Sequence, residues 1–200
     1  MNSDDPGLDG YSVAMPNAMK AIDHSEIWLF VGCSPRELRQ IRQSLDEARV
    51  SAGQVLCQEG SIGREFFLIV EGEASVRRKN RKIATLGPGG YFGELALLDN
   101  QPRSATVVAD TDMTLLVLER RAFIGALDSV PSLARKLLSA MAARLRETDA
   151  KAFSADTDLL LLLLEERKFI AMLDAAPPLA RKLLGAMSTR LREADAKAFH

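Results

Sequence analysis

Residues 90–107 read GYFGELALLDNQPRSATV, and this stretch carries the most informative chemistry of the chain. Glycines around its start let the backbone approach a ligand closely, at Gly89, Gly90 and Gly93. Leu95–Leu98 are expected to form one helical turn, and the free N–H groups at a helix start attract anions. Arg103 adds a forked donor that suits phosphate, and Ser104 adds a hydroxyl. The spacing therefore predicts an anion-binding turn.

Glu94 is the exception within this stretch, because a carboxylate beside a phosphate would repel it. The same carboxylate is useful if it accepts a hydrogen bond from a sugar hydroxyl. An anion site with one acid directed at hydroxyls indicates a ribose phosphate as the ligand.

The segment from Ala48 to about Leu118 consists of short apolar runs separated by glycines. Phe66–Val70 and Ala105–Ala109 have the composition of strands. Residues 71–73, Glu-Gly-Glu, interrupt the first run before it resumes at Ala74. Many short strands with glycine turns predict a β-sandwich, barrel or jelly roll.

The motif Gly93-Glu94-x-Ala96-Leu97, followed after five residues by Arg103–Val107, resembles the phosphate-binding cassette of cyclic nucleotide-binding domains. That family includes the bacterial cyclic AMP receptors and the regulatory subunits of cyclic-nucleotide-dependent kinases. The glycine pattern of residues 51–56, 59–60, 67–72 and 86–89 extends the resemblance, which covers about residues 26–153. It implies an α+β fold: an antiparallel β-roll, or jelly roll, flanked by N-terminal helices and a long C-terminal helix.

The resemblance also implies roles for the residues of the cassette. Glu94 would accept a hydrogen bond from the ribose 2′-hydroxyl, and Arg103 would pair with the cyclic phosphate. Ser104 would donate to the phosphate, and Ala105 follows it within the motif. The backbone N–H groups that would hold ribose and phosphate oxygens are those of Gly93, Leu95 and Ala96.

The base of the nucleotide lies against the long C-terminal helix in this family. In the bacterial cyclic AMP receptors an Arg-Leu-x-x-Thr-Ser stretch of that helix reaches phosphate and adenine. Residues 144–149, RLRETD, align with this stretch. Arg144 and Thr148 match, whereas Asp149 replaces the serine. Thr148 is thus the candidate base contact, although an exposed helical threonine explains it as well.

In the kinase branch threonine after the cassette arginine accompanies guanine and alanine accompanies adenine. Ser104 is intermediate but is shared with bacterial receptors, which favours cyclic AMP over cyclic GMP.

Helical patterns flank the strand-rich segment. Residues 19–48 are predicted to be helical, with Ser34 as N-cap, Pro35 at the first helical position and Glu37 completing a capping box. A helix is expected again near Arg121, followed by a long one over Ser132–Lys151. The apolar stripe of that long helix comprises Leu133, Leu137, Leu138, Met141 and Leu145.

Residues 109–154 and 155–200 are copies of each other, with 31 identities and 15 differences at 46 aligned positions. If the strand Met113–Leu118 fills a place in the sheet, its copy has none there, and the sequence alone leaves open which copy is used. The copy has become six leucines, so we predict that Asp158–Leu173 is helical. The duplicated tail, residues 154–200, is then either an extra helical hairpin or an added dimerisation or strand-swapping element.

Composition excludes several classes of function. The 26 basic and 27 acidic residues give a net charge of −1, and residues 155–200 hold seven of each, so direct DNA binding is not expected. Two cysteines and two histidines, Cys33, Cys57, His24 and His200, do not make a metal site, and no catalytic triad is evident. The acidic N-terminus is no signal peptide, and the longest apolar run, residues 159–164, is too short for a membrane span.

These patterns predict a cytoplasmic protein with a disordered tail over residues 1–18, a cyclic nucleotide-binding domain over 19–153 and the duplicated tail. It would be a regulatory sensor and no enzyme. Cyclic AMP would be an effector, and no cofactor is expected. Binding would move the C-terminal helix about a hinge near Arg121–Leu127 or change the oligomeric state. A homodimer through the long helix and an unidentified protein partner are expected. The alternative is a scaffold that does not sense nucleotide, or a truncated relative of a transcriptional regulator.

Overall fold

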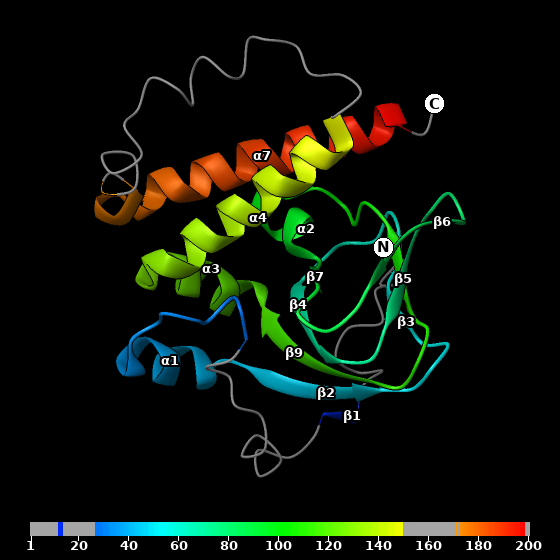
Figure 1. Ribbon diagram of the computed structural model, residues 1–200, viewed down its shortest axis with the longest axis horizontal. Helices are drawn as coiled ribbons and strands as arrows, with labels where there is room; N and C mark the ends of the chain where they lie inside the picture. Colours follow the sequence, from blue (N-terminus) through cyan, green and yellow to red (C-terminus); the bar gives the residue numbers. More distant parts are fainter. Residues whose placement is uncertain (1–11, 14–26, 150–170, 172, 199–200) are drawn as a thin grey trace. The chain divides into compact units, whose positions relative to one another are not determined.

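Short apolar runs between glycine turns form two antiparallel sheets (Figure 1). The computed structural model describes residues 12–13, 27–149, 171 and 173–198. The chain divides into two compact units, Met1–Gly125 and Ala126–His200. In sheet order, the five-stranded sheet of the first unit contains β1 (Ser12–Val13), β2 (Asp46–Val50), β9 (Met113–Glu119), β4 (Glu65–Glu71) and β7 (Tyr91–Phe92). The four-stranded sheet contains β3 (Val55–Cys57), β8 (Thr106–Ala109), β5 (Ala74–Arg78) and β6 (Arg81–Leu86).

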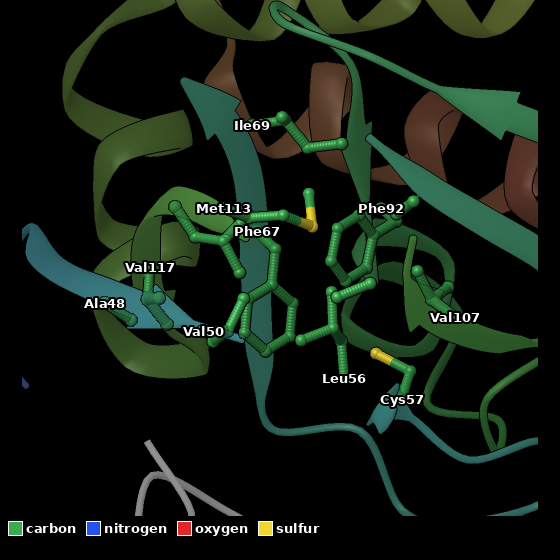
Figure 2. Close-up of a cluster of buried hydrophobic side chains, with 13 residues drawn as sticks. Ala48, Val50, Leu56, Cys57, Phe67, Ile69, Phe92, Val107, Met113 and Val117 are labelled. Carbon is green, nitrogen blue, oxygen red and sulfur yellow. The ribbon is translucent and has the colours of Figure 1, made fainter. Parts of the chain in front are cut away.

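The core of the first unit lies between these sheets, because both contribute apolar side chains to one buried cluster (Figure 2). Phe67 of β4 and Phe92 of β7 stack with ring centroids 4.8 Å apart. Leu56 of β3 and Val107 of β8 enter the same cluster from the second sheet. A β-roll with helices, and hence the α+β class, is thus confirmed.

Strand β9 occupies the centre of the larger sheet, between β2 and β4. Leu116 lies opposite Glu47 of β2 and Leu68 of β4. The first copy of the duplicated strand therefore fills the place in the sheet. The corresponding residues of the second copy, 159–164, lie outside the described residues.

Helix α1 (Pro35–Arg42) begins with the predicted capping box. The Glu37 N–H donates to Ser34 Oγ at 3.3 Å, and the Ser34 N–H donates to Glu37 Oε2 at 2.6 Å. The prediction that residues 19–48 are helical was wrong on both sides of α1: residues 28–32 form turns, and no helix continues to residue 48. The helix ends at Arg42, and β2 begins at Asp46 because the chain there pairs with β9 and buries Ala48 and Val50.

The helices with given bounds that follow the sheets in the described part of the chain are α3 (Arg120–Ser129), α4 (Pro131–Asp149) and α7 (Pro177–Ala198). The helices predicted near Arg121 and over 132–151 are confirmed as α3 and α4, apart from residues 150–151, which are not described. Within the second unit α7 lies alongside α4 (Figure 1). None of the described helices combines the length and apolar character that a bilayer crossing requires.

Two predictions fall mostly on parts of the chain that the structure does not describe. Within the predicted tail, residues 1–18, only Ser12 and Val13 are described, and they form β1. Within Asp158–Leu173 only Ala171 and Leu173 are described, and both are helical.

Candidate functional site

Arg103 is the centre of the candidate site. It follows the short helix α2 (Glu94–Asp99) and precedes β8, and its side chain is buried, with 4% of the residue exposed. Its Nη1 donates to the Glu65 carbonyl at 2.9 Å and to the Gly93 carbonyl at 3.0 Å. Its Nη2 lies 3.2 Å from Glu65 Oε2, which makes a buried ion pair. The guanidinium is thus fixed from both β4 and the start of α2.

Two glycines make room for this guanidinium. Gly93, the residue before α2, has φ +89°, and a Cβ there would lie 2.5 Å from Arg103 Nη1. A Cβ at Gly63 would lie 2.7 Å from both Arg103 Nε and the Ala96 Cβ. Any side chain at either position would therefore displace the arginine or its neighbours.

The remaining surroundings of Arg103 are partly apolar. Its guanidinium carbon lies 5.7 Å from the centroid of the Phe67 ring. Its Nε is buried and has no hydrogen-bond partner among the described residues. A buried cation demands an anion and a full set of acceptors. Glu65 supplies one anion, and an unused donor remains on the same group.

The other predicted cassette residues follow each other through α2 and the loop after it. Glu94 occupies the first turn of α2 and is only 2% exposed, and Leu95 and Ala96 are also buried. Ser104 and Ala105 are partly exposed. The structure joins Arg103 to Gly93 by a hydrogen bond, and Ala96 and Arg103 both lie against Gly63. It places Glu94 and Leu95 between Gly93 and Ala96 on the same turn.

Arg144 and Thr148 belong to α4, in the other compact unit. Arg144 is exposed, whereas the side chain of Thr148 lies outside the described residues. Their contact with phosphate and base stays a prediction.

Sequence reasoning did not find Glu65 as the partner of Arg103. The signal was present, because Glu65 is an acid that directly precedes the apolar run Phe66–Val70 and is buried with it. Phe67, beneath the guanidinium, was likewise assigned only to a strand. Both were missed because 38 residues separate Glu65 from Arg103 in the sequence.

A tryptophan side chain holds the loop before β7 in place. Trp28 Nε1 donates to the Gly89 carbonyl at 2.6 Å, and its ring lies 5.8 Å from that of Tyr91. Tyr91 in turn contacts Phe66, which stacks on Phe123 of α3 at 4.8 Å. The loop that leads to the cassette is thus held by the N-terminal segment of the same unit.

The site is organised around a buried cation, and among the described residues no group of three His, Cys, Asp or Glu side chains is placed to hold a metal ion. A guanidinium between glycines, hydrogen-bonded to the residue before a short helix that begins with a buried acid, is suited to bind an anionic group that also carries hydroxyls.

Comparison with known proteins identifies this arrangement. The model of the family described as "Cyclic nucleotide-binding domain" matches residues 47–129. The cyclic AMP receptor protein of Thermus thermophilus is 33% identical over 126 residues, which cover 60% of this chain and 58% of that protein. A cAMP-dependent protein kinase regulatory subunit of Mycosarcoma maydis is 39% identical over 107 residues, or 49% of this chain and 20% of that protein.

Among solved structures, the N-terminal domain of a transcriptional regulator from Streptomyces coelicolor A3(2) is 31% identical, with a TM-score of 0.51. The match covers 64% of this chain and 93% of that one. The chain spans less than two thirds of the length of either curated relative. The matched residues contain the whole cassette from Gly93 to Ala105 and the Glu65 that pairs with its arginine. The chain contains a cyclic nucleotide-binding domain, matched over residues 47–129.

Proposed function

We propose that this chain is a sensor of cyclic AMP, in which the nucleotide acts as an effector and is not converted. The proposal rests above all on Arg103, a buried guanidinium that keeps one donor without a partner among the described residues. Its position in the family cassette, between Gly93 and Ser104, supports a pairing of this cation with the cyclic phosphate.

The neighbouring groups would bind the rest of the ribose phosphate. Glu94, buried in the first turn of α2, would accept a hydrogen bond from the ribose 2′-hydroxyl. Ser104, partly exposed beside Arg103, would donate to the phosphate. Backbone N–H groups of Gly93, Leu95 and Ala96 would complete the cradle. Arg144 and Thr148 would contact phosphate and base from α4.

Glu65 gives the site a defined state without nucleotide. Its carboxylate neutralises Arg103 at 3.2 Å, so the cation remains compensated when no phosphate is bound. The phosphate would approach the same guanidinium and share it with Glu65. Binding would thereby add the phosphate to the ion pair of Arg103 and Glu65 and make the cassette more rigid.

Cyclic AMP is proposed over cyclic GMP for two reasons. Ser104 follows the cassette arginine, where the guanine-selective kinase branch has threonine. The two curated relatives described above are named for cyclic AMP.

The proposed output is a change in the position of α4. Helix α3 begins in the first unit and ends in the second, since the division falls between Gly125 and Ala126. This boundary lies inside the proposed hinge, Arg121–Leu127. Nucleotide shifts the helix only to the extent that it binds one arrangement more tightly than the other. Hydrogen exchange of α3 that is unchanged by saturating nucleotide would contradict this output.

Isothermal titration calorimetry tests the binding itself. Wild-type protein is titrated with cyclic AMP and with cyclic GMP, and so are Arg103→Ala and Glu94→Gln. The matched control is Arg81→Ala, which removes an exposed arginine of β6. We expect cyclic AMP to bind wild type and Arg81→Ala alike, and both cassette variants to lose at least tenfold in affinity. If the folded wild type binds neither nucleotide, the chain is an interaction scaffold instead.

A further inference from the structure

The two copies of the duplicated segment contribute helices that pack against each other. Helix α4 comes from the first copy and α7 from the second, and an offset of 46 residues relates them. Figure 1 shows α7 beside α4, with both helices running in the same direction. The helix that accompanies α4 is therefore a near-duplicate of α4 itself.

Two ion pairs join the copies, and the pairs are reciprocal. Arg135 Nη1 of the first copy lies 2.7 Å from Asp174 Oδ2 of the second. Arg181 Nε of the second copy lies 2.7 Å from Asp128 Oδ1 of the first. Adding 46 to 128 and 135 gives 174 and 181, so the same two positions pair in both directions. All four side chains have similar exposure, between 35% and 39%.

The apolar contact obeys the same relation. Ala134 and its counterpart Ala180 are both 2% exposed, and Leu127 and its counterpart Leu173 are both buried. The buried residues of α7 and the turn before it recur mostly at spacings of three or four, as in a seam between two helices: Leu173, Ala180, Leu184, Ser188, Leu191 and Ala194.

Reciprocal contacts between equivalent positions are the signature of a two-fold, isologous interface. Such an interface normally joins two identical chains. Here both halves belong to one chain, because the duplication supplies the second helix.

The symmetry does not extend to every buried position of the two helices. Leu133, Leu137 and Met141 of α4 are buried, whereas their counterparts on α7 are partly exposed, at Leu179, Leu183 and Met187. Conversely, Leu184, Ser188 and Leu191 of α7 are buried, whereas their counterparts on α4, Leu138, Ala142 and Leu145, are partly exposed. The reciprocity therefore lies in the two ion pairs and in the apolar pairs Leu127/Leu173 and Ala134/Ala180.

We infer that α7 fills, within one chain, the place that α4 of a second chain would take in a two-fold dimer. The seam of α4 is an interface for a copy of the same helix, and its occupant is α7 of the same chain. The chain is accordingly a closed internal pseudo-dimer that does not dimerise through α4. This replaces the homodimer that the long helix alone predicts, and it does not depend on nucleotide binding.

Chemical cross-linking of the full chain tests which chain supplies the occupant. Cysteines replace one ion pair in Arg135→Cys/Asp174→Cys, with Cys33→Ser to remove the more accessible native thiol. A short bismaleimide should link α4 and α7 within one molecule, so that a denaturing gel shows monomers with altered mobility. The reciprocal variant Asp128→Cys/Arg181→Cys should behave in the same way, and Arg135→Cys alone should show no link. Covalent dimers from the paired variants would overturn the inference, because the helices would then come from different chains.

Light scattering after size exclusion supplies an independent test. Wild type should have the mass of one chain, and a concentration-independent dimer would contradict the inference. Leu184→Asp, which places a charge in the seam on α7, should release α4 and raise the mass to two chains. The double variant Leu138→Asp/Leu184→Asp charges both equivalent positions and should return to one chain. Lys182→Asp, at an exposed position of α7, is the matched control and should not change the mass. A Leu184→Asp protein that keeps its circular dichroism spectrum and stays monomeric would overturn the inference, and if this variant unfolds, the cross-link decides.

Discussion

Arg103 and Glu65 form an ion pair at 3.2 Å, and the exposed fractions of the two side chains are only 3% and 9%. The pair connects the loop after α2 to the first residue of β4. Because both groups are removed from water, each depends on the other for compensation of its charge.

The first prediction concerns the loss of this partner. Glu65→Ala leaves the Arg103 cation buried without its carboxylate, so we expect the free energy of unfolding to fall by about 3 to 5 kcal/mol. Urea unfolding measures the loss. Glu65→Gln keeps a side chain of similar size with one acceptor oxygen, so its free energy of unfolding should fall less.

Nucleotide makes this prediction specific to the site. Its phosphate should stand in for the missing carboxylate, so the stabilisation by saturating cyclic AMP should be larger in Glu65→Ala than in wild type. Equal stabilisation of the two proteins at the same concentration of cyclic AMP would show that phosphate does not stand in for the carboxylate at Arg103.

The second prediction concerns Gly93, which has φ +89°. Gly93→Ala adds about 1 to 2 kcal/mol of backbone strain in the left-handed region. Its Cβ also meets Arg103 Nη1 and the Glu65 carbonyl, at 2.5 and 2.7 Å. We expect lower stability and an affinity for cyclic AMP reduced by about tenfold or more, a change of about 1.4 kcal/mol.

The matched control for this change is Gly87→Ala in the preceding turn. A Cβ at Gly87 meets no atom within 4 Å, and its φ is not in the left-handed region. Calorimetry and urea unfolding should show little effect. A Gly87→Ala protein as impaired as Gly93→Ala would mean that the whole turn, and not the contact with Arg103, is sensitive.

The third prediction is a pH dependence at Asp110, the residue that follows β8. The Ser75 hydroxyl lies 2.6 and 2.5 Å from its two carboxylate oxygens, and Lys82 Nζ lies 3.1 Å from one of them. These hydrogen bonds, that of Ser75 first, lower the pKa of Asp110 below its ordinary value of 3.8. The native state holds the charged form, so the stabilisation is complete above pH 3.8 and is lost as pH falls through the lower native pKa.

Substitution at the two donors tests this cause. Carboxyl-carbon NMR titration should show a higher pKa for Asp110 in Ser75→Ala, and a smaller rise in Lys82→Met. An order opposite to this would mean that the ammonium of Lys82, and not the Ser75 hydroxyl, dominates the shift.

Local patterns predicted most of the fold. The strands around Phe67 and Val107, the capping box at Ser34 and the long helix from Pro131 each depend on neighbouring residues, and all are present. Asp46–Ala48, the first residues of β2, were assigned to a helix because their strand character depends on β9, more than 60 residues later. Glu65 escaped detection for the same reason, since only the folded sheet brings it to Arg103. The partner of α4 was equally hidden, because repeat identity shows that two helices are alike but not that they pack together.

The last prediction uses the duplication as an internal reference. Ser188 of α7 is fully buried, and its Oγ has no hydrogen-bond partner among the described residues. The equivalent residue of the first copy is Ala142. Ser188→Ala removes an unsatisfied buried hydroxyl and favours the helix slightly, so the free energy of unfolding should rise by about 1 kcal/mol. Thr189→Ala, which also restores the residue of the first copy, is the control: Thr189 is exposed and its Oγ1 already donates to the Gly185 carbonyl at 3.2 Å. Urea unfolding should show a clearly larger gain in the free energy of unfolding for Ser188→Ala than for Thr189→Ala. Equal gains would mean that the effect comes from helix propensity alone and not from the buried hydroxyl.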